Sequence, residues 1–578
     1  MWTADWWWEI QELLPRGSTL APIIISTDKT QLTRFSGDKQ AWPVYLTISN
    51  IEKGVRWSPS SRATILIGYI PVTKLEIFSK AKRATVSHQL FHDCMRAILE
   101  PLCAAGVDGV KMDCADGFVR RMFPVLAAYI ADYPEQCLVA CCRENSCPRC
   151  LVPPKRRGEP VNSTLHDPGE TLQVIVDQSQ NKFPVKFVDQ NLRPINPFWA
   201  GFPHCNIFSC MTPDLLHELH NGVFGDHIVK WSTKAATGGD QEIDQRGISL
   251  TSKWTGNECK NMEKVFLGIL AQATDPAIQR AAATIIDFIY YAHFETHCDE
   301  SLARLDAAWA AFHKDKSIFL ELEIRKHFDI NKLHKLKHYV DSIRSRGTAD
   351  GFNTENTERL HIDFAKAGYW VTNKVRYTRQ MTVWLARQEA IYKFGTYLQW
   401  AVPGYIVNPN STNSDNNELE EEDDAVPVPH PQPDDPDSDD EGELDGNMSS
   451  PSPLPSHVPK NPSFPRVPVA TIVSEFHAPD FLIKHDDFLE SNSINPRHQP
   501  DDNSAFSVYK RLSIPLPQIS EVTSHIVYDT IRAVRGEPGK LTPKGIIPAK
   551  EGRFDTVLVH KSPPGHQAHP TEGKTYIP

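Results

Sequence analysis

Residues 21–28 read Ala21-Pro22-Ile23-Ile24-Ile25-Ser26-Thr27-Asp28, an apolar and β-branched run that ends in an acid. Such a run predicts a buried strand, and a carboxylate at its end is costly unless it is paired or binds a cation. A second apolar run, residues 123–131, ends at Asp132 in the same way. Far downstream, Glu355 and Glu358 lie three residues apart, on one face of a predicted helix. Two such acids and a distant Glu could hold two Mg²⁺ ions for cutting a phosphodiester.

Each of these acids also has a plainer interpretation. Asp28 could cap a helix or a turn, and Asp132 could be an ordinary turn residue. Three nearby acids, Asp108, Asp113 and Asp116, compete with Asp132 for the role of second acid. Asp108 and Asp116 precede glycine, which is typical of turns, so Asp132 is preferred.

The first part of the chain predicts a sheet. Residues 20–27, 42–48 and 63–69 are apolar and β-branched, with polar turn residues between them, and predict three strands. Residues 75–101 predict a helix and residues 107–112 another short strand. A strand-rich opening followed by alternating strands and helices predicts an α/β core around a mixed sheet.

Composition divides the chain into six segments. We expect an aromatic lead-in at 1–17, the first part of the core at 18–230, a helical insertion at 231–330, a helical return of the core at 331–404, a linker at 405–465 and a small strand-bearing C-terminal region at 466–578. Apolar residues recur at helical spacing between residues 260 and 325, so the insertion is predicted to be all-helical. The linker is rich in Asp, Glu, Pro and Ser, a composition that buries too little apolar surface to fold, and we expect it to be disordered.

Charge is spread unevenly along the 578 residues. The formal net charge is −11, but residues 411–459 contain 15 acids and no Lys or Arg, so the remainder carries +4. A mildly basic folded part is compatible with DNA binding. The aromatic and acidic residues 1–9 do not read as a signal peptide, and no uncharged apolar run approaches the ~18 residues that a membrane span needs. We therefore expect no membrane association.

The cysteines predict a metal site rather than a disulfide scaffold. Most of the 12 cysteines crowd between residues 94 and 150, which favours a reduced, intracellular protein. Cys147-Pro148-Arg149-Cys150 is a Cys-x-x-Cys knuckle, and Cys142 precedes it by five residues. These three cysteines predict part of a zinc site whose fourth ligand stays open among Cys137, Cys141 and a distant His. The alternative is a set of buried thiols with a chance Cys-x-x-Cys.

Asp214 and His217 lie directly after Pro213, a sequence typical of a helix start. Three residues apart on a helix, they would share one face and could grip a metal, a phosphate-bound water or each other. The plainer alternative is a helix start with a surface histidine.

A basic run precedes Glu355 and comprises Lys332, Lys335, Lys337 and His338. It predicts a positively charged approach to the acids, and a solvated basic helix is the alternative.

Taken together, these segments resemble the Plavaka transposases of fungi, relatives of the Kyakuja–Dileera–Zisupton and CACTA-type cut-and-paste elements. The segments that carry the resemblance are residues 27–33, 35–47, 128–137 leading into the Cys-x-x-Cys knuckle, 211–217, 353–355 and 358–361. The resemblance covers about residues 3–400 and, more loosely, the tail.

The resemblance implies an RNase H-like catalytic core of the DDE/D type that is interrupted by a helical insertion. In such a core Asp28 matches the first acid at the end of the first strand, and Asp132 matches the second, in an Asp-Tyr-Pro before a Cys-x-x-Cys. Glu355 matches the third acid, with Glu358 as the second choice. Asp214 with His217 is similar to the Cys-or-Asp-x-x-His signature of the superfamily, and His217 would orient a phosphate or water.

The implied chemistry is phosphoryl transfer with two Mg²⁺ or Mn²⁺ ions, which excises the element ends and joins them to target DNA. The resemblance further implies a nuclear protein that acts as a homo-oligomer on DNA. Related transposases carry a long N-terminal region before the first catalytic strand, whereas here that strand begins about twenty residues from Met1, so we expect a truncated or relict chain. The alternatives are a domesticated, catalytically silent DNA- or chromatin-binding protein and a structural zinc-containing interaction module.

Overall fold

The computed structural model divides the chain into two compact units, Met1–Asn416 and Asn417–Pro578, which are described separately. The described residues are 1–33, 39–114, 116–238, 254–271, 274–402, 405, 462–476, 478–491, 500–501, 504–509, 511–515, 528–534, 540–542, 545–547 and 553–554. Nearly all of the predicted linker at 405–465 lies outside the described residues.

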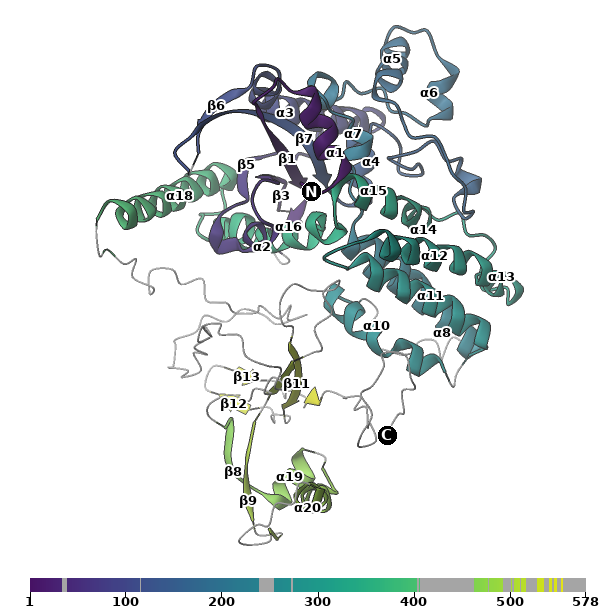
Figure 1. The fold of residues 1–578 in the computed structure, drawn as a ribbon, viewed down its shortest axis with the longest axis vertical. Coiled ribbons are helices and arrows are strands. Elements are labelled where there is room, and N and C mark those ends of the chain that lie inside the picture. The colour runs from purple at the N-terminus through teal and green to yellow at the C-terminus, as the bar shows by residue number, and fades with distance from the viewer. Residues whose placement is uncertain are drawn as a thin grey trace. The chain divides into compact units, whose positions relative to one another are not determined.

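A five-stranded mixed sheet forms the centre of the first unit, with the strand order β5-β4-β1-β7-β6 (Figure 1). Its strands are β1 (Thr19–Thr27), β4 (Pro43–Ile48), β5 (Ile65–Tyr69), β6 (Val110–Asp113) and β7 (Val119–Ile130). Strand β1 is parallel to β7 and antiparallel to β4, while β5 and β6 form antiparallel edges. The predicted α/β class with a mixed sheet is confirmed, and β1, β4 and β5 lie where the β-branched segments predicted strands. A short hairpin of β2 (Thr30–Gln31) and β3 (Gln40–Ala41) follows β1.

Both faces of the sheet are covered, which explains why β1 is apolar without alternation. Ile23 and Ile25 point to one face and pack in a cluster that includes Phe91 of helix α3 (Lys80–Asp108). On the other face, Ile24 packs with Phe352, from a segment more than three hundred positions downstream. Helix α1 (Asp5–Leu13) covers the start of β1 and β7 on that second face.

Helix α3 is longer than the sequence predicted. We expected a helix at 75–101, but it begins at Lys80 and continues through Pro101 to Asp108. Proline removes one backbone hydrogen bond, yet the helix continues to Gly106, where a Cβ would lie only 2.7 Å from Pro203 and 2.8 Å from the Pro124 carbonyl. This close packing holds the last turn of α3 against β7, so the next strand begins at Val110 rather than at residue 107.

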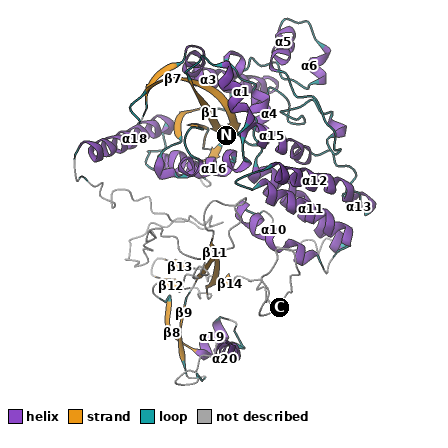
Figure 2. Cartoon of the chain, in the orientation of Figure 1, coloured by secondary structure: helices purple, strands orange, loops and turns teal. Residues whose placement is uncertain are grey.

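Helices dominate the described residues after β7 (Figure 2). They include α4 (Tyr133–Val139), α5 (Pro168–Ser179), α6 (Val185–Asp189), α7 (Ile207–Cys210), η4 (Leu215–Val229), α8 (Lys230–Thr237), α10 (Gly256–Leu270), α11 (Pro276–Ala292), α12 (Asp299–Asp315) and α13 (Ile318–Glu321). The predicted helices between 260 and 325 are confirmed. Their apolar faces form a second core around Phe224, Phe266, Phe288 and Phe312.

The chain then returns to the sheet. Short helices α14 (Asn331–Lys335), η5 (Leu336–His338), α15 (Tyr339–Arg346) and η6 (Ala349–Phe352) lead to α16 (Thr354–His361), η7 (Ile362–Ala367), α17 (Gly368–Trp370) and the long α18 (Tyr377–Ala401). Phe352 packs with Ile24, Ala128 and Ile130 on the sheet, and this anchors the start of α16 beside the ends of β1 and β7.

The second unit contains short strands and two helices in its described residues. Strands β8 (Phe464–Pro468) and β9 (Ala505–Val508) pair, α19 (Val469–Glu475) and α20 (Phe481–Ser491) lie between them in sequence, and β10 (Arg511–Pro515), β11 (Tyr528–Val534) and β14 (Arg553–Phe554) form a sheet. Strands β12 (Lys540–Thr542) and β13 (Gly545–Ile547) form a further pair. Residues 555–578 lie outside the described residues.

Within the described residues, the helices are all too short or too polar to cross a membrane.

Candidate active site

Asp28 and Asp132 lie at the same edge of the sheet. Strands β1 and β7 are parallel neighbours, and their last paired residues are Ser26 and Ile130. Each acid follows its partner of this pair by two residues, so both leave the sheet at the carboxyl ends of adjacent strands. The three competing acids lie at the opposite end of β7, because Asp113 pairs with Val119 at its start.

Asp28 is a half-buried acid among other acids. Its side chain is 28% exposed, and Nδ1 of His361 lies 3.9 Å from its Oδ2. Burial, together with the charges of Asp132 and Glu358, raises the pKa of Asp28 to about 7, while the charge of His217 opposes this rise. Burial also lowers the pKa of His361 to about 4, so this imidazole is neutral at neutral pH and does not compensate the charge. A bound cation would stabilise the ionised form of such a carboxylate.

Asp132 caps helix α4, whereas its plainer interpretation was an ordinary turn residue. Its Oδ1 accepts a hydrogen bond of 2.9 Å from the backbone N–H of Glu135. This bond fixes the side chain at the edge of the sheet and occupies one carboxylate oxygen, while a carboxylate has acceptor sites on both oxygens. The capping role and a ligand role are therefore compatible.

Glu358 is the third acid that the structure brings to Asp28. Helix α16 begins at Thr354, so Glu355 and Glu358 both lie on it. Oε1 of Glu358 accepts a hydrogen bond of 2.8 Å from Nε2 of His217, and its charge acts on the pKa of Asp28. Glu358 was our second choice from the sequence.

Glu355, our first choice, has different partners. Its Oε1 lies 2.6 Å from Nζ of Lys260 in α10, and its Oε2 accepts a hydrogen bond of 2.9 Å from Asn353. Burial would raise the pKa of Glu355, but Lys260 outweighs it and lowers the pKa below its usual value. Glu355 is thus a charge-paired acid that faces the helical region, and the structure does not favour it as the third acid. The two glutamates are one helical turn apart, and the sequence did not reveal which one faces the sheet.

The carboxylate of Asp214 contacts the backbone N–H of His217. Asp214 is 2% exposed, and its carboxylate accepts from the N–H groups of Leu216 (3.1 Å) and His217 (3.3 Å) and from the Thr354 hydroxyl (2.8 Å). Asp214 therefore ties the start of η4 to the start of α16. This holds His217 opposite Glu358.

His217 carries a positive charge beside the acids. Burial would lower its pKa, but the hydrogen bond to Glu358 and the charge of Asp214 raise it to about 9. The protonated imidazole is 37% exposed, so it can also reach a negatively charged ligand.

Glu135 is a site residue that the sequence analysis missed. It is 7% exposed, and its carboxylate accepts hydrogen bonds from the Thr27 hydroxyl and from Nε1 of Trp42 (3.1 Å). Burial raises its pKa to about 8. The sequence marked Glu135 only as an acid in the first turn of a helix after proline, and nothing in that pattern indicated burial behind Asp28.

The basic run before Glu355 does not form an approach to the acids. Lys335 is 4% exposed, pairs with Glu218 and donates to Oε1 of Gln136 at 2.8 Å. Lys332 bonds Asp226 at 3.1 Å, and Lys337 lies 3.7 Å from Asp306. The three lysines pair with acids within the fold. Our prediction of a positively charged approach to the acids was therefore wrong.

A second cluster unites Cys147 and Cys150 with His334 and His338. The four donor atoms all lie within 4.8 Å of one another, and all four side chains are buried. Sγ of Cys147 lies 3.4 Å from Nε2 of His338, and Sγ of Cys150 lies 3.1 Å from Nε2 of His334. Two thiolates and two imidazoles are a donor set that suits tetrahedral zinc. In the part of the chain that the structure describes, no other group of three or more such donors is this tight.

Cys142 is not a member of this cluster. Its backbone pairs with Leu192, and its buried thiol neighbours Cys137. Our prediction of Cys142 as a metal ligand is therefore corrected, and of the three options for the remaining donors, a distant histidine is the one that the structure favours. The spacing His334-x-x-x-His338 is typical of zinc ligands and was the overlooked signal.

One comparison with known proteins gives a family. Residues 1–232 match the family model described as Plavaka transposase. These residues are similar to the Plavaka transposase family. The match includes Asp28, Asp132, the cysteine knuckle and His217, whereas α16 with Glu358 lies beyond it. No curated protein matches the chain. The family supports a transposase function, and a transposase acts on DNA.

Proposed function

We propose that this chain cuts and joins DNA by phosphoryl transfer at a divalent-cation site formed by Asp28, Asp132 and Glu358. The observation that carries the proposal is the convergence of these three acids at the carboxyl ends of β1 and β7, where their combined charge and burial raise the pKa of Asp28 to about 7. Hard carboxylate oxygens are the donor set that Mg²⁺ and Mn²⁺ prefer.

The sheet supports an RNase H-like core for this site. A first acid after one strand and a second acid after its parallel neighbour is the arrangement such a core needs, and β1 and β7 provide it. We further propose that residues 18–230 and 331–404 form this core and that residues 231–330 are a helical insertion. The insertion would separate Glu358 from the first two acids in sequence without separating them in space.

Divalent cations bound to these acids would activate water or a 3′-hydroxyl and stabilise the leaving oxygen of an in-line displacement. The chain's own residues prepare that site. Glu135 and Thr27 lock the ends of α4 and β1 together behind the acids, and Asp214 holds the start of α16 in place. The His217 imidazolium orients Glu358 and presents a positive charge to a phosphate oxygen.

We propose that the cluster of Cys147, Cys150, His334 and His338 holds a structural zinc ion. Hydrogen bonding from Cys150 and both imidazoles outweighs burial and lowers the pKa of Cys147 well below its usual value, which favours the thiolate that binds zinc. Such an ion would fasten the knuckle that follows α4 to the helices that lead back to α16. It would thereby hold Asp132 and Glu358 at the same site.

From the similarity to transposases we also propose DNA as the partner and the nucleus as the location. We further propose that the chain assembles as a homo-oligomer on DNA.

Nicking of supercoiled plasmid DNA in Mn²⁺ or Mg²⁺ tests the catalytic proposal. We expect the wild type to nick, and Asp28→Asn, Asp132→Asn and Glu358→Gln to lose the activity by at least a hundredfold. Glu355→Gln is the matched control, because it removes the same charge one helical turn away, and it should retain most of the activity. Activity that survives Glu358→Gln but not Glu355→Gln would refute the assignment of the third acid.

A further inference from the structure

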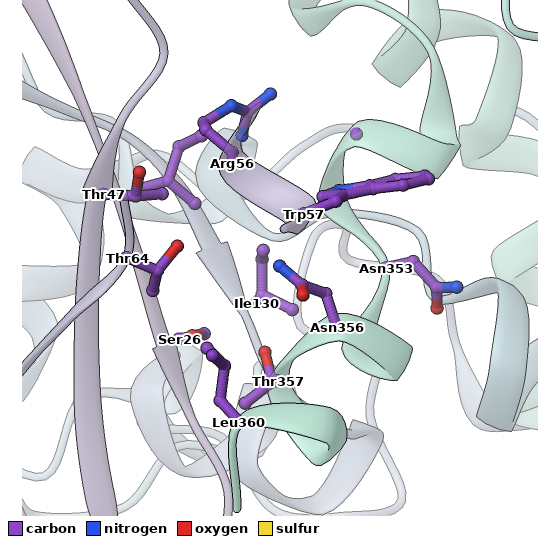
Figure 3. Close-up of a pocket in the computed structure, with 12 residues that line it drawn as sticks. Ser26, Thr47, Arg56, Trp57, Thr64, Ile130, Asn353, Asn356, Thr357 and Leu360 are labelled. Carbon is purple, nitrogen blue, oxygen red and sulfur yellow. The ribbon is translucent and has the colours of Figure 1, made fainter. Parts of the chain in front are cut away.

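A hollow with both polar and apolar lining lies beside the proposed active site, on the same face of the sheet. It is lined by residues of the sheet (Ile24, Ser26, Thr47, Thr64 and Ile130), of helix α2 (Lys53–Trp57), namely Arg56 and Trp57, and of the segment around α16 (Gly351, Asn353, Asn356, Thr357 and Leu360). Figure 3 shows Thr64 and Ser26 on one side and Asn356 and Thr357 on the other, with Arg56 and Trp57 above them.

The hollow lies close to Asp28 and Asp132 along strands β1 and β7. Ser26 and Ile130 are the last paired residues of β1 and β7, and Asp28 and Asp132 follow two residues later on the same strands. Two residues of strand span about 7 Å. That step is comparable with the distance between neighbouring phosphates of one DNA strand.

Thr64 is buried with an unused hydroxyl. It is 7% exposed, and its Oγ1 has no hydrogen-bond partner among the described residues, although it lines the hollow. A buried hydroxyl that makes no hydrogen bond is costly, and an acceptor from outside the chain would remove that cost. Thr64 can donate one hydrogen bond to such a ligand.

Arg56 supplies positive charge to the same space. It is 8% exposed, and only its Nε makes a hydrogen bond within the described residues, to the carbonyl of Ile51 at 3.2 Å. The nearby acid Asp350 forms an ion pair with Lys53, so two cations share one carboxylate. The terminal nitrogens of a guanidinium match the geometry of a phosphate.

We propose, on the basis of the proposed function, that this hollow binds one backbone phosphate of the DNA strand, next to the phosphate that the acids cleave. Arg56 and Thr64 donate to the phosphate oxygens, and the amide of Asn356 lies opposite them. Trp57, which is 37% exposed at the rim, offers a ring for the adjacent base. The contact is independent of sequence and sets the distance between the hollow and the cleavage position.

DNA affinity without divalent cations tests this proposal separately from catalysis. Fluorescence anisotropy of a short fluorescein-labelled duplex should show about a tenfold loss of DNA affinity for Arg56→Gln. The slope of log affinity against log salt concentration should also become shallower by about one. Arg62→Gln is the control, because Arg62 is an exposed arginine that stacks on Tyr392 outside the hollow, and it should change the affinity far less. A competitor duplex with methylphosphonate in place of phosphate should bind wild type and Arg56→Gln alike, and added inorganic phosphate should compete with DNA only in the wild type.

Thr64→Val keeps the proposal testable if Arg56→Gln does not fold. This isosteric change removes the unpaired hydroxyl, so we expect a higher melting temperature together with a severalfold lower DNA affinity, while Thr64→Ser keeps the affinity. Asp28→Asn should bind DNA without divalent cations but should not nick it when the cations are added. Unchanged affinity in both Arg56→Gln and Thr64→Val would overturn the phosphate site, and a loss of nicking confined to the acid variants would leave the catalytic proposal intact.

Discussion

Replacing Asp28 by Asn should stabilise the first unit, and the gain should depend on pH. The pKa of Asp28 rises from an ordinary 3.8 to about 7 in the folded chain. Because each tenfold change in proton affinity is worth about 1.4 kcal/mol, ionising this acid in the fold costs on the order of 4 kcal/mol. The cost exists because Asp28 is buried beside Asp132 and Glu358.

The sign follows from which state binds the proton. Between about pH 4 and pH 7 the unfolded chain has released the proton of Asp28 and the folded chain still holds it, so stability falls as the pH rises. Above pH 7 both states are ionised and the loss is complete. The Asp28→Asn variant should therefore gain on the order of 4 kcal/mol over wild type at pH 8, about 1–2 kcal/mol at pH 5 and almost nothing near pH 4.

Urea unfolding followed by tryptophan fluorescence measures this gain. All 13 tryptophans lie at or before Trp400, so the signal reports on the first unit alone. Asp113→Asn, on the exposed strand β6, is the matched control and should not stabilise the first unit at pH 8. Added Mg²⁺ should stabilise wild type and not Asp28→Asn, since binding to the folded state alone raises stability. A gain that is independent of pH, or a destabilisation at pH 8, would refute the placement of Asp28 beside Asp132 and Glu358.

Three further changes test the surrounding scaffold. Cys147→Ser should lose bound zinc in elemental analysis and lower the melting temperature of the first unit, whereas Cys142→Ser should keep one zinc per chain; equal loss in both would contradict the cluster. Lys335→Met leaves Glu218 charged and buried, so it should cost about 3–5 kcal/mol in urea unfolding, and adding Glu218→Gln should recover part of that loss. Asp214→Ala removes a helix cap and the bond to Thr354, so it should cost about 1–2 kcal/mol and lower nicking by displacing α16; an unchanged nicking rate would argue against its positioning role.

Local patterns predicted the sheet because they are strong there. The runs that became β1, β4 and β5 are β-branched and bounded by polar turns, so their type follows from residue chemistry alone. The acids Asp28 and Asp132 followed from the same patterns, because a charged residue after an apolar run marks the end of a buried element. The parallel pairing of β1 and β7, which brings these acids together, is a tertiary contact across about a hundred residues that no local pattern records.

The third acid and the metal cluster show where sequence reasoning stops. Glu355 and Glu358 are chemically identical and one turn apart, and only the packing of α16 between the sheet and α10 sends one to Asp28 and the other to Lys260. The knuckle at Cys147 indicated zinc, but its histidines come from residues nearly two hundred positions downstream. The basic run was misread because its charges pair with acids on neighbouring helices rather than with solvent or DNA.

Anomalous diffraction from crystals soaked in Mn²⁺ tests most directly whether Asp28, Asp132 and Glu358 share a cation. We predict manganese peaks bounded by the carboxylates of these three residues and absent from crystals of the Asp28→Asn variant. Peaks that involve Glu355 instead, or no peak at the ends of β1 and β7 while the crystals bind manganese elsewhere, would contradict the proposed catalytic site.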